Sequence, residues 1–418
     1  MDYFRIDQVC DVNPPKDIPR FKGMEVSFIP MDAVSTTGEV DVSRTISGDG
    51  VKNYSVFQNR DVLFAKITPC MENGKGGIVD DLKNGFGAGS TEFIVIRPDE
   101  KKVISEWVQL FLSQSSYRIE CKNHMTGSAG QKRVPPKFIA GTVIPVPALD
   151  VQRRIVSRIE ELFSELDNSV STLQKTKEQL TVYQQAVLKE AFEGNLKISH
   201  HGIDTDLKWA TQEETKDLPE LSNGWRYVHL SQLGDLGRGR SKHRPRNDKR
   251  LFEDGKYPFL QTGEVKAAKN TITEAKRKYG EFGLAQSKMW PKGTLCITIA
   301  ANIAETAFLG IDACFPDSVV GFTPSDLVKA EYVRFFIESQ KLKLSAFAPA
   351  TAQKNINLET LEKLVIPYCG IQEQQEVIDE IESRLSVCDS IEQTVDTALQ
   401  QAEAMRQSIL KQAFEGRL

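Results

Sequence analysis

The chain has 418 residues, a formal net charge of −4, 26% charged residues and seven cysteines. This length predicts two to four domains, and the composition is typical of a globular protein in water. No apolar run approaches the roughly 18 residues of a membrane-spanning helix, the opening MDYFRIDQV carries no targeting signal, and no cysteines are spaced as CxxC. We therefore expect a cytoplasmic chain with reduced thiols, no metal site and no membrane partner.

Residues 1–147 are expected to form a first globular domain of mixed α/β structure. Runs rich in β-branched and aromatic residues predict strands at Asp61–Ile67 and Thr91–Ile96, and a helical segment begins at Ser105. This domain has no dense basic cluster. Its scattered candidates for contact with a nucleic acid are Lys66, Lys75, Lys132 and Arg133.

Two long stretches without glycine or proline predict two long helices, within segments 148–196 and 369–418. Gly194 and Gly416 are suited to cap their C-termini. Apolar residues recur at alternating steps of four and three, which is the spacing of a coiled-coil seam. The predicted interface residues are Ile155, Ile159, Leu162, Leu166, Leu173, Leu180 and Phe192 in the first helix and Ile381, Ile391, Val395 and Phe414 in the second. The same seam passes through Ser169, Tyr183 and Met405.

The polar segment 197–223 predicts a flexible linker, and residues 224–368 predict a second mixed α/β domain that begins with GWRYV. Strand-like runs lie at Thr294–Ile299 and Ser318–Thr323, and a helical segment begins at Ala330.

One segment of the second domain is strongly basic. RGRSKHRPRNDKR, residues 238–250, holds seven Lys/Arg and one acidic residue in thirteen, and glycine and proline mark it as a loop. Such a loop suits phosphate contact and arginine forks on guanine edges, and a merely solvated loop is the alternative. The two long helices carry a net charge of −8, which leaves +4 for the rest of the chain. The candidate DNA-binding residues here are Arg238, Arg240, Lys242, Arg244, Arg246, Lys249 and Arg250.

The chain is one unit of about two hundred residues written twice. AVLKEAFEGNL at residues 186–196 returns as SILKQAFEGRL at residues 408–418, and an offset of 222 positions holds without a gap from Gly130 onward. Upstream of Gly130 the two copies drift apart. Two copies of this size indicate two domains that share an accessory element.

Each long helix exposes an apolar stripe, and the other copy is the simplest partner for it. If the chain builds its second domain between the helices, they run antiparallel. We therefore expect an α+β (mixed α/β) fold with two globular domains, two long antiparallel coiled-coil helices and a pseudo-twofold internal repeat. A coiled-coil hairpin that acts only as a scaffold is the alternative for the helices alone.

No catalytic constellation is visible. NPPK at Asn13–Lys16 resembles the (D/N)PP(aromatic) motif of adenine methyltransferases, but Lys16 replaces the aromatic residue that stacks on a flipped base. GDLGRGR at Gly234–Arg240 lacks the GK[ST] of a phosphate-binding loop. We interpret both as turns, and we expect no catalytic residue.

The chain resembles the specificity subunits of type I restriction-modification systems. The resemblance rests on the GWRYVHLSQLGDL opening, the TAQKNIN element at Thr351–Asn357, the VIP segment at Val365–Pro367 and the closing ILKQAFEGRL. The first copy departs from it, with GSAGQKRVPP at Gly127–Pro136 and no leading Gly-Trp. Gln353 and Lys354 of the TAQKNIN element join the DNA-binding candidates.

This resemblance implies that residues 1–147 and 224–368 are two target-recognition domains, each of which reads one half of a bipartite site in double-stranded DNA. It also implies that the helices set the half-site spacing and dock two methyltransferase subunits, with motor-endonuclease subunits joining the complex. S-adenosylmethionine, ATP and Mg²⁺ would then belong to the partners and no cofactor to this chain. Two rival classes stay open: a stand-alone enzyme with atypical motifs, and a coiled-coil adaptor that binds proteins but not DNA.

Overall fold

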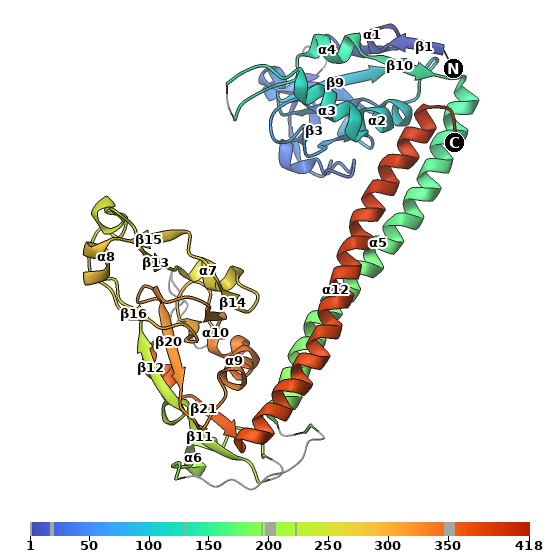
Figure 1. The fold of residues 1–418 in the computed structure, drawn as a ribbon. Coiled ribbons are helices and arrows are strands. Elements are labelled where there is room, and N and C mark those ends of the chain that lie inside the picture. The colour runs from blue at the N-terminus through green and yellow to red at the C-terminus, as the bar shows by residue number, and fades with distance from the viewer. Residues whose placement is uncertain are drawn as a thin grey trace. The chain divides into compact units, whose positions relative to one another are not determined.

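The computed structural model describes residues 2–16, 21–128, 130–193, 195–196, 206–221, 224–346 and 356–418 (Figure 1). Contacts divide the chain into two compact units. Unit 1 is Met1–Lys175 with Val395–Leu418, and unit 2 is Thr176–Thr394. Each unit therefore contains one globular domain together with a section of both long helices.

Unit 1 contains three sheets, in the orders β1-β10, β2-β9-β6-β7 and β4-β3-β8-β5. The pairings are antiparallel except for β3 with β8. The strands are β1 Asp2–Arg5, β2 Cys10–Val12, β3 Glu25–Ile29, β4 Thr45–Ser47, β5 Ser55–Gln58, β6 Val62–Ala65, β7 Gly76–Ile78, β8 Phe86–Gly89, β9 Phe93–Pro98 and β10 Val143–Val146. The helices of its globular part are α1 Ile6–Val9, α2 Ser105–Ser113, α3 Ser115–Asn123 and α4 Pro136–Gly141.

Unit 2 contains sheets in the orders β11-β21, β12-β20-β17-β18-β14 and β15-β13-β19-β16. Its strands are β11 Arg226–His229, β12 Gly234–Arg238, β13 Tyr257–Phe259, β14 Thr271–Ile272, β15 Arg277–Tyr279, β16 Met289–Trp290, β17 Leu295–Thr298, β18 Thr306–Leu309, β19 Ala313–Cys314, β20 Val319–Pro324 and β21 Val365–Tyr368. Its shorter helices are α6 Gln212–Thr215, α7 Thr262–Ala267, α8 Glu281–Ala285, α9 Ala330–Ser339, α10 Lys341–Ala346 and α11 Leu358–Glu362.

The two units repeat one strand order. β2-β9-β6-β7 of unit 1 corresponds to β12-β20-β17-β18 of unit 2. The register agrees as well, because Cys10 lies opposite Pro98 in the first sheet and Gly234 opposite Pro324 in the second. The predicted strands appear as β6, β9, β17 and β20, and the predicted helical segments as α2 and α9. The mixed α/β prediction is confirmed for both domains.

The two long helices are α5, Leu149–Phe192, and α12, Ile371–Phe414, each of 44 residues. Within each unit they run antiparallel. In unit 2, Lys177 pairs with Glu392 at 3.5 Å and Glu190 with Arg384 at 2.8 Å, so α12 numbers fall as α5 numbers rise. In unit 1, Asp167 pairs with Arg406, whose guanidinium lies 4.2 Å from the Phe163 ring.

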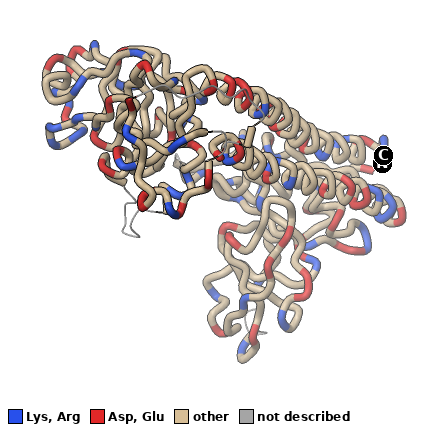
Figure 2. The backbone as a smooth tube through the Cα atoms, turned by 90° about the horizontal axis from the view of Figure 1, so that it is seen from below, with Lys and Arg blue, Asp and Glu red and all other residues tan. Residues whose placement is uncertain are grey.

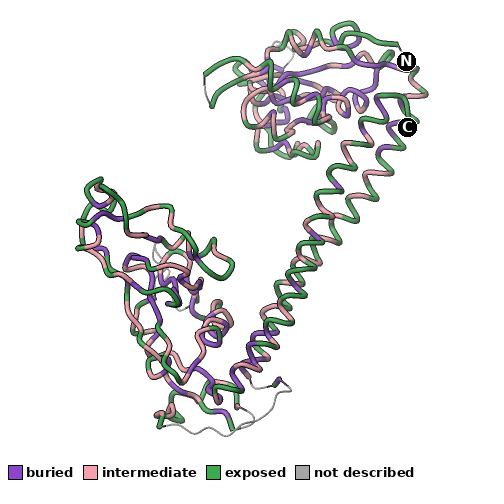
Figure 3. Tube along the Cα trace, in the orientation of Figure 1, coloured by how far each residue is buried: buried purple, intermediate pink, exposed green. Residues whose placement is uncertain are grey.

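The observed seam is the predicted one, displaced by one residue at four places. Ile155, Ile159, Phe192, Ile381, Val395 and Phe414 are buried, and Leu162, Leu166, Leu173 and Leu180 are half-buried. Along both helices, buried and half-buried stretches alternate with exposed ones (Figure 3). Ile391, however, is 40% exposed, Tyr183 49% and Met405 55%, and Ser169 is exposed too. The half-buried positions are instead their successors, Val170, Gln184, Glu392 and Arg406. All four displacements run toward the C-terminus, and each affects a single position, because the next predicted seam residues, Leu173, Val187, Val395 and Ile409, are again buried or half-buried.

Each long helix ends inside the domain of the other copy. Phe414 of α12 lies 4.6 Å from the Trp107 ring and 5.4 Å from the Phe111 ring of α2. Phe192 of α5 meets Tyr332 and Phe336 of α9 in the same way, at 5.1 and 5.3 Å. The phenylalanine of each AFEG segment thus packs against aromatic rings in the globular domain of the other copy, once in each unit.

The helix ends have matching caps. Gly416 has φ +74°, and the Arg417 N–H donates to the Gln412 carbonyl at 2.8 Å, so the helix closes in the left-handed conformation that glycine favours. The Asn195 N–H donates to Glu190 in the same way, at 3.2 Å. Gly194, the predicted cap of the first helix, lies outside the described residues.

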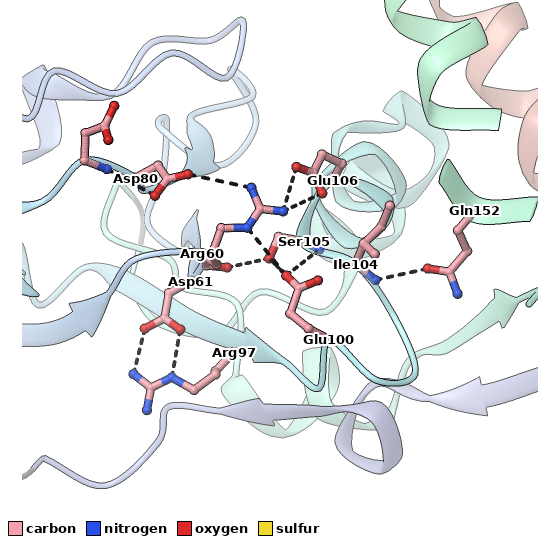
Figure 4. A network of polar contacts seen from close by, with 10 residues as sticks. Arg60, Asp61, Asp80, Arg97, Glu100, Ile104, Ser105, Glu106 and Gln152 are labelled. Atoms are coloured by element: carbon pink, nitrogen blue, oxygen red, sulfur yellow. Dashed lines mark hydrogen bonds and ion pairs between the residues drawn. The ribbon is translucent and has the colours of Figure 1, made fainter. Parts of the chain in front are cut away.

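A buried glutamine fastens the start of each long helix to its domain. Gln152 accepts a hydrogen bond from the Ile104 N–H at 3.0 Å (Figure 4). It also donates to the carbonyls of Lys102 and Pro147 at 2.9 and 2.7 Å. In unit 2, Gln374 accepts from Lys329 and donates to the carbonyls of Leu327 and Cys369. Both side chains are fully buried, so the repeat retains glutamine because three backbone groups depend on it.

Replacing Gln374 with leucine is expected to lower the free energy of unfolding of unit 2 by about 3 kcal/mol, because the Lys329 N–H and the Cys369 carbonyl lose their partner and the Leu327 carbonyl keeps only the Tyr368 hydroxyl. Urea unfolding followed by hydrogen exchange measures the loss. The matched control is Gln372→Leu, two residues away and on the exposed side of α12, for which we expect a change below about 0.5 kcal/mol. Equal losses for the two variants would show that the buried amide is not what fastens the helix.

The leading Gly-Trp of the second copy has a partner that the first copy lacks. Trp225 donates from Nε1 to the buried Glu373 carboxylate at 2.7 Å. The first copy has Val151 at the position that corresponds to Glu373. The first copy therefore lacks both the tryptophan donor and the glutamate acceptor of this hydrogen bond.

All seven cysteines are free, and burial raises the pKa of Cys10 to about 12 and that of Cys121 to about 12. Within the described ranges, no helix is both long enough and apolar enough to cross a membrane.

Candidate nucleic-acid interface

The basic segment 238–250 leaves strand β12 and is fastened at its base. The Gly239 N–H donates to the Val319 carbonyl at 2.8 Å, and the Arg240 N–H donates to the Phe315 carbonyl at 3.0 Å. A side chain at Gly239 would lie 2.3 Å from the carbonyl oxygens of Phe315 and Pro316, so only glycine permits this approach. Backbone hydrogen bonds therefore fix the start of this loop to the sheet.

Four of its seven cations are engaged by acidic residues or carbonyls. Asp317 organises three of them: its carbonyl accepts from Arg238 at 2.9 Å, its carboxylate accepts from Arg246 at 2.6 Å, and Arg244 lies 4.0 Å away. Arg250 pairs with Asp248 at 2.7 Å. The Arg250 hydrogen bond, assisted by His243, holds the pKa of Asp248 well below its usual range.

The other three cations, Arg240, Lys242 and Lys249, are exposed. Their side chains have no hydrogen bond or ion pair with any residue that the structure describes. Their charge is consequently free to meet an anion, whereas the engaged arginines are oriented but partly neutralised.

A second basic segment, which we did not predict, lies beside this loop. Lys249 and Asn247 line a hollow of about 420 Å³ together with Phe252, Gly255, Arg277 and Lys278. The Arg277 guanidinium lies 3.8 Å from the centre of the Phe252 ring, which holds it in place. Three successive cations, Lys276–Lys278, were the available signal in the sequence, but they lie at strand β15, 26 positions beyond Arg250 at the end of the loop.

In unit 1 the fold gathers three of the four scattered cations. Lys132 and Thr68 are joined through the backbone at 3.0 Å, and the Val134 N–H donates to the Lys66 carbonyl at 2.9 Å. Arg133 makes a two-pronged ion pair with Glu92, which lowers the pKa of Glu92 through that hydrogen bond. Lys66 donates to the Thr91 carbonyl at 2.7 Å, and Lys132 is exposed. The backbone carbonyl of Lys75 accepts from the Ala65 N–H at 3.2 Å, but its side chain is turned to the Met31 carbonyl, to which it donates at 2.8 Å.

Gln353 and Lys354 lie outside the described residues. The two lookalike motifs have structural roles. The Asn13 side chain accepts from the Val95 N–H at 3.0 Å in a turn with φ +52°, and Gly234–Arg238 forms strand β12. The described part of the chain holds no group of three or more metal-ligating side chains. Acidic residues recur along both long helices, where they outnumber Lys and Arg (Figure 2).

Comparison with known proteins places this chain beside one family. A family model described as type I restriction modification DNA specificity domain matches residues 1–181 and again residues 223–401. The chain is similar to the specificity subunit of the type I restriction enzyme EcoAI of Escherichia coli, with 34% identity over 52% of this chain and 36% of that protein. Its similarity to the EcoEI specificity subunit of Escherichia coli is 24% identity over 96% of this chain and 80% of that protein. The matched stretch thus spans about a third of the EcoAI subunit.

Two solved structures have the same fold. One chain, from a structural study of complex assembly and conformational transition of the type I R-M system, matches with a TM-score of 0.78 and 20% identity over 100% of this chain and 98% of that chain. The HsdS subunit from Thermoanaerobacter tengcongensis matches with a TM-score of 0.57 and 20% identity over 100% and 97%.

Proposed function

This chain belongs to the type I restriction modification DNA specificity family, and from that membership we propose that it is the DNA-reading subunit of a type I restriction-modification complex. Each globular domain reads one half of a bipartite, asymmetric site in double-stranded DNA. The long helices set the distance between the halves and dock two methyltransferase subunits, through which motor-endonuclease subunits join. The chain itself is not catalytic, and S-adenosylmethionine, ATP and Mg²⁺ belong to the partners.

One observation carries this proposal: each unit places a group of cations beside the corresponding strand of one repeated sheet. In unit 1 the group is Lys66, Lys132 and Arg133 next to β9. In unit 2 it is the loop 238–250 next to β20. The cations differ in number and geometry, so the two domains suit two different DNA sequences.

A pull-down of the tagged chain from its native cells tests the proposal. The eluate is assayed for transfer of labelled methyl groups from S-adenosylmethionine to adenine in DNA. We expect methylation at one split sequence. A pull-down that contains no methyltransferase activity would favour the coiled-coil adaptor, whose cellular role would also survive charge reversal across Arg238–Arg250.

Removing one free cation should weaken DNA binding equally for all sequences. For Lys242→Gln we expect the slope of log affinity against log salt concentration to become shallower by about 0.9, because one phosphate contact is lost. Titration of the complex at several salt concentrations measures the slope.

The matched control is Lys292→Gln, also exposed and in unit 2. Lys292 precedes the Leu295 end of β17, whereas the basic loop lies at the end where Thr298 pairs with Val319. The control should leave the slope unchanged. A slope that does not respond to Lys242→Gln would remove the loop from the DNA contact.

A further inference from the structure

An acidic residue lies in the turn that enters the same strand of each repeated sheet. Glu92 directly precedes β9, and Asp317 lies two residues before β20. These strands correspond, because β9 lies between β2 and β6 and β20 lies between β12 and β17. Two domains that share little sequence in this region have thus kept a carboxylate at one place in the fold.

Each carboxylate holds an arginine that comes from another segment. Glu92 accepts from Arg133 Nε at 2.9 Å and from its Nη2 at 2.8 Å, and the Gln131 carbonyl accepts from Nη1. Asp317 accepts from Arg246 Nη2 at 2.6 Å. A guanidinium has five N–H groups, so Arg133 and Arg246 both keep unengaged donors on their terminal nitrogens. Their side chains are 41% and 49% exposed.

The two arginines that are paired with a carboxylate lie next to cations that have no ion pair. Lys132 adjoins Arg133, and Arg240, Lys242 and Lys249 share the loop of Arg246; none of these four has an ion pair among the described residues. Arg246 also borders a hollow of about 250 Å³, whose lining includes Thr262 and Ser318. The hydroxyls of Thr262 and Ser318 have no hydrogen-bond partner within the described part of the chain.

This division between held and free cations has a physical reason if the partner is DNA. A phosphate attracts any cation, and a carboxylate beside that cation would weaken the attraction. A guanine edge instead presents two acceptors, O6 and N7, that need a guanidinium fork in a fixed plane. A carboxylate that orients the fork therefore favours base reading and disfavours phosphate contact.

We propose that Arg133 and Arg246 are base-reading side chains, each bonded to a guanine edge in its own half-site, and that Glu92 and Asp317 are the residues that position them. This inference rests on the proposed function and adds to it which side chains discriminate between sequences. Thr262 and Ser318 offer further donors and acceptors next to Arg246.

The test uses the purified complex and duplexes in which each base pair of the split site is replaced in turn. For Arg246→Lys we expect the preference for guanine at one position of one half-site to fall roughly ten- to a hundredfold, with the other half-site unaffected. Asp317→Asn should lose the same preference while keeping its salt slope, and Asp317→Glu should restore it. Arg133→Lys and Glu92→Gln should repeat this pattern in the other half-site.

Lys249→Ala is the matched control, because it removes a free cation from the same loop. It should weaken binding to every duplex equally and change no preference. If Arg246→Lys gives the same uniform profile as Lys249→Ala, Arg246 is a phosphate contact and the inference is wrong. If the unaltered complex distinguishes no split sequence, the proposed function fails instead. Hydrogen exchange of loop 238–250 in Asp317→Asn identifies a loop that has merely unfolded, and in that case Arg246→Lys, which keeps the charge, decides alone.

Discussion

Phe414→Ala should lower the free energy of unfolding of unit 1 by about 3–5 kcal/mol and leave unit 2 unchanged. The Phe414 ring is 7% exposed and packs on Trp107 and Phe111, so its removal leaves a cavity beneath α2. Phe192→Ala should do the reverse, because that ring packs on Tyr332 and Phe336 of unit 2. Hydrogen exchange read separately over α2 and α9 measures both effects.

Met405→Ala is the control for Phe414→Ala, since Met405 lies on the same helix and is 55% exposed. It should change the stability of unit 1 by less than about 0.5 kcal/mol. Similar exchange rates over α2 in Phe414→Ala and Met405→Ala would contradict the view that the end of α12 closes unit 1.

Lengthening the long helices should move the half-sites apart without changing either of them. Four residues inserted after Thr176 of α5 add about 6 Å of helix, and four inserted after Thr394 of α12 keep the antiparallel seam in register. At about 3.4 Å of DNA axis per base pair, the spacer between the half-sites should grow by one to two base pairs. Sequencing of methylated adenines in cells that carry the lengthened chain reports the spacer directly.

An insertion in α5 alone serves as the control. It shifts pairs such as Lys177 with Glu392 and Glu190 with Arg384 by one turn, so we expect lower stability together with the altered spacer. A methylated site whose spacer is unchanged in the doubly lengthened chain would rule out the helices as the element that sets the spacing.

The sequence predicted the helices and strands of this fold better than the tertiary contacts that those elements make. Internal repetition and the absence of glycine and proline located both long helices, because both signals can be read from the sequence without knowledge of tertiary contacts. The reciprocal packing of Phe192 and Phe414 was not predictable in detail, since the rings that receive them, such as Tyr332 and Trp107, are far away in the chain. Ile391 was placed in the seam because it falls on the alternating steps of four and three, whereas the structure half-buries its successor Glu392 instead.

For the candidate interface, the sequence showed where positive charge is dense but not which of the cations are paired with an acidic residue. The loop 238–250 stood out by composition, yet nothing in that composition separates Arg246, held by Asp317, from the free Lys242. Asp317 is 71 positions from Arg246, and Glu92 is 41 positions from Arg133. Such pairs depend on tertiary contacts, which explains why Lys66, Lys132 and Arg133 looked scattered in the sequence.

The central claim is that each domain reads one half-site independently of the other. Exchange of residues 224–364 for the corresponding segment of the EcoEI relative, followed by mapping of methylated adenines, tests it most directly. We predict a methylated site in which one half-site is new while the other half-site and the spacer are retained. Methylation in which both half-sites change, or neither does, would contradict the account.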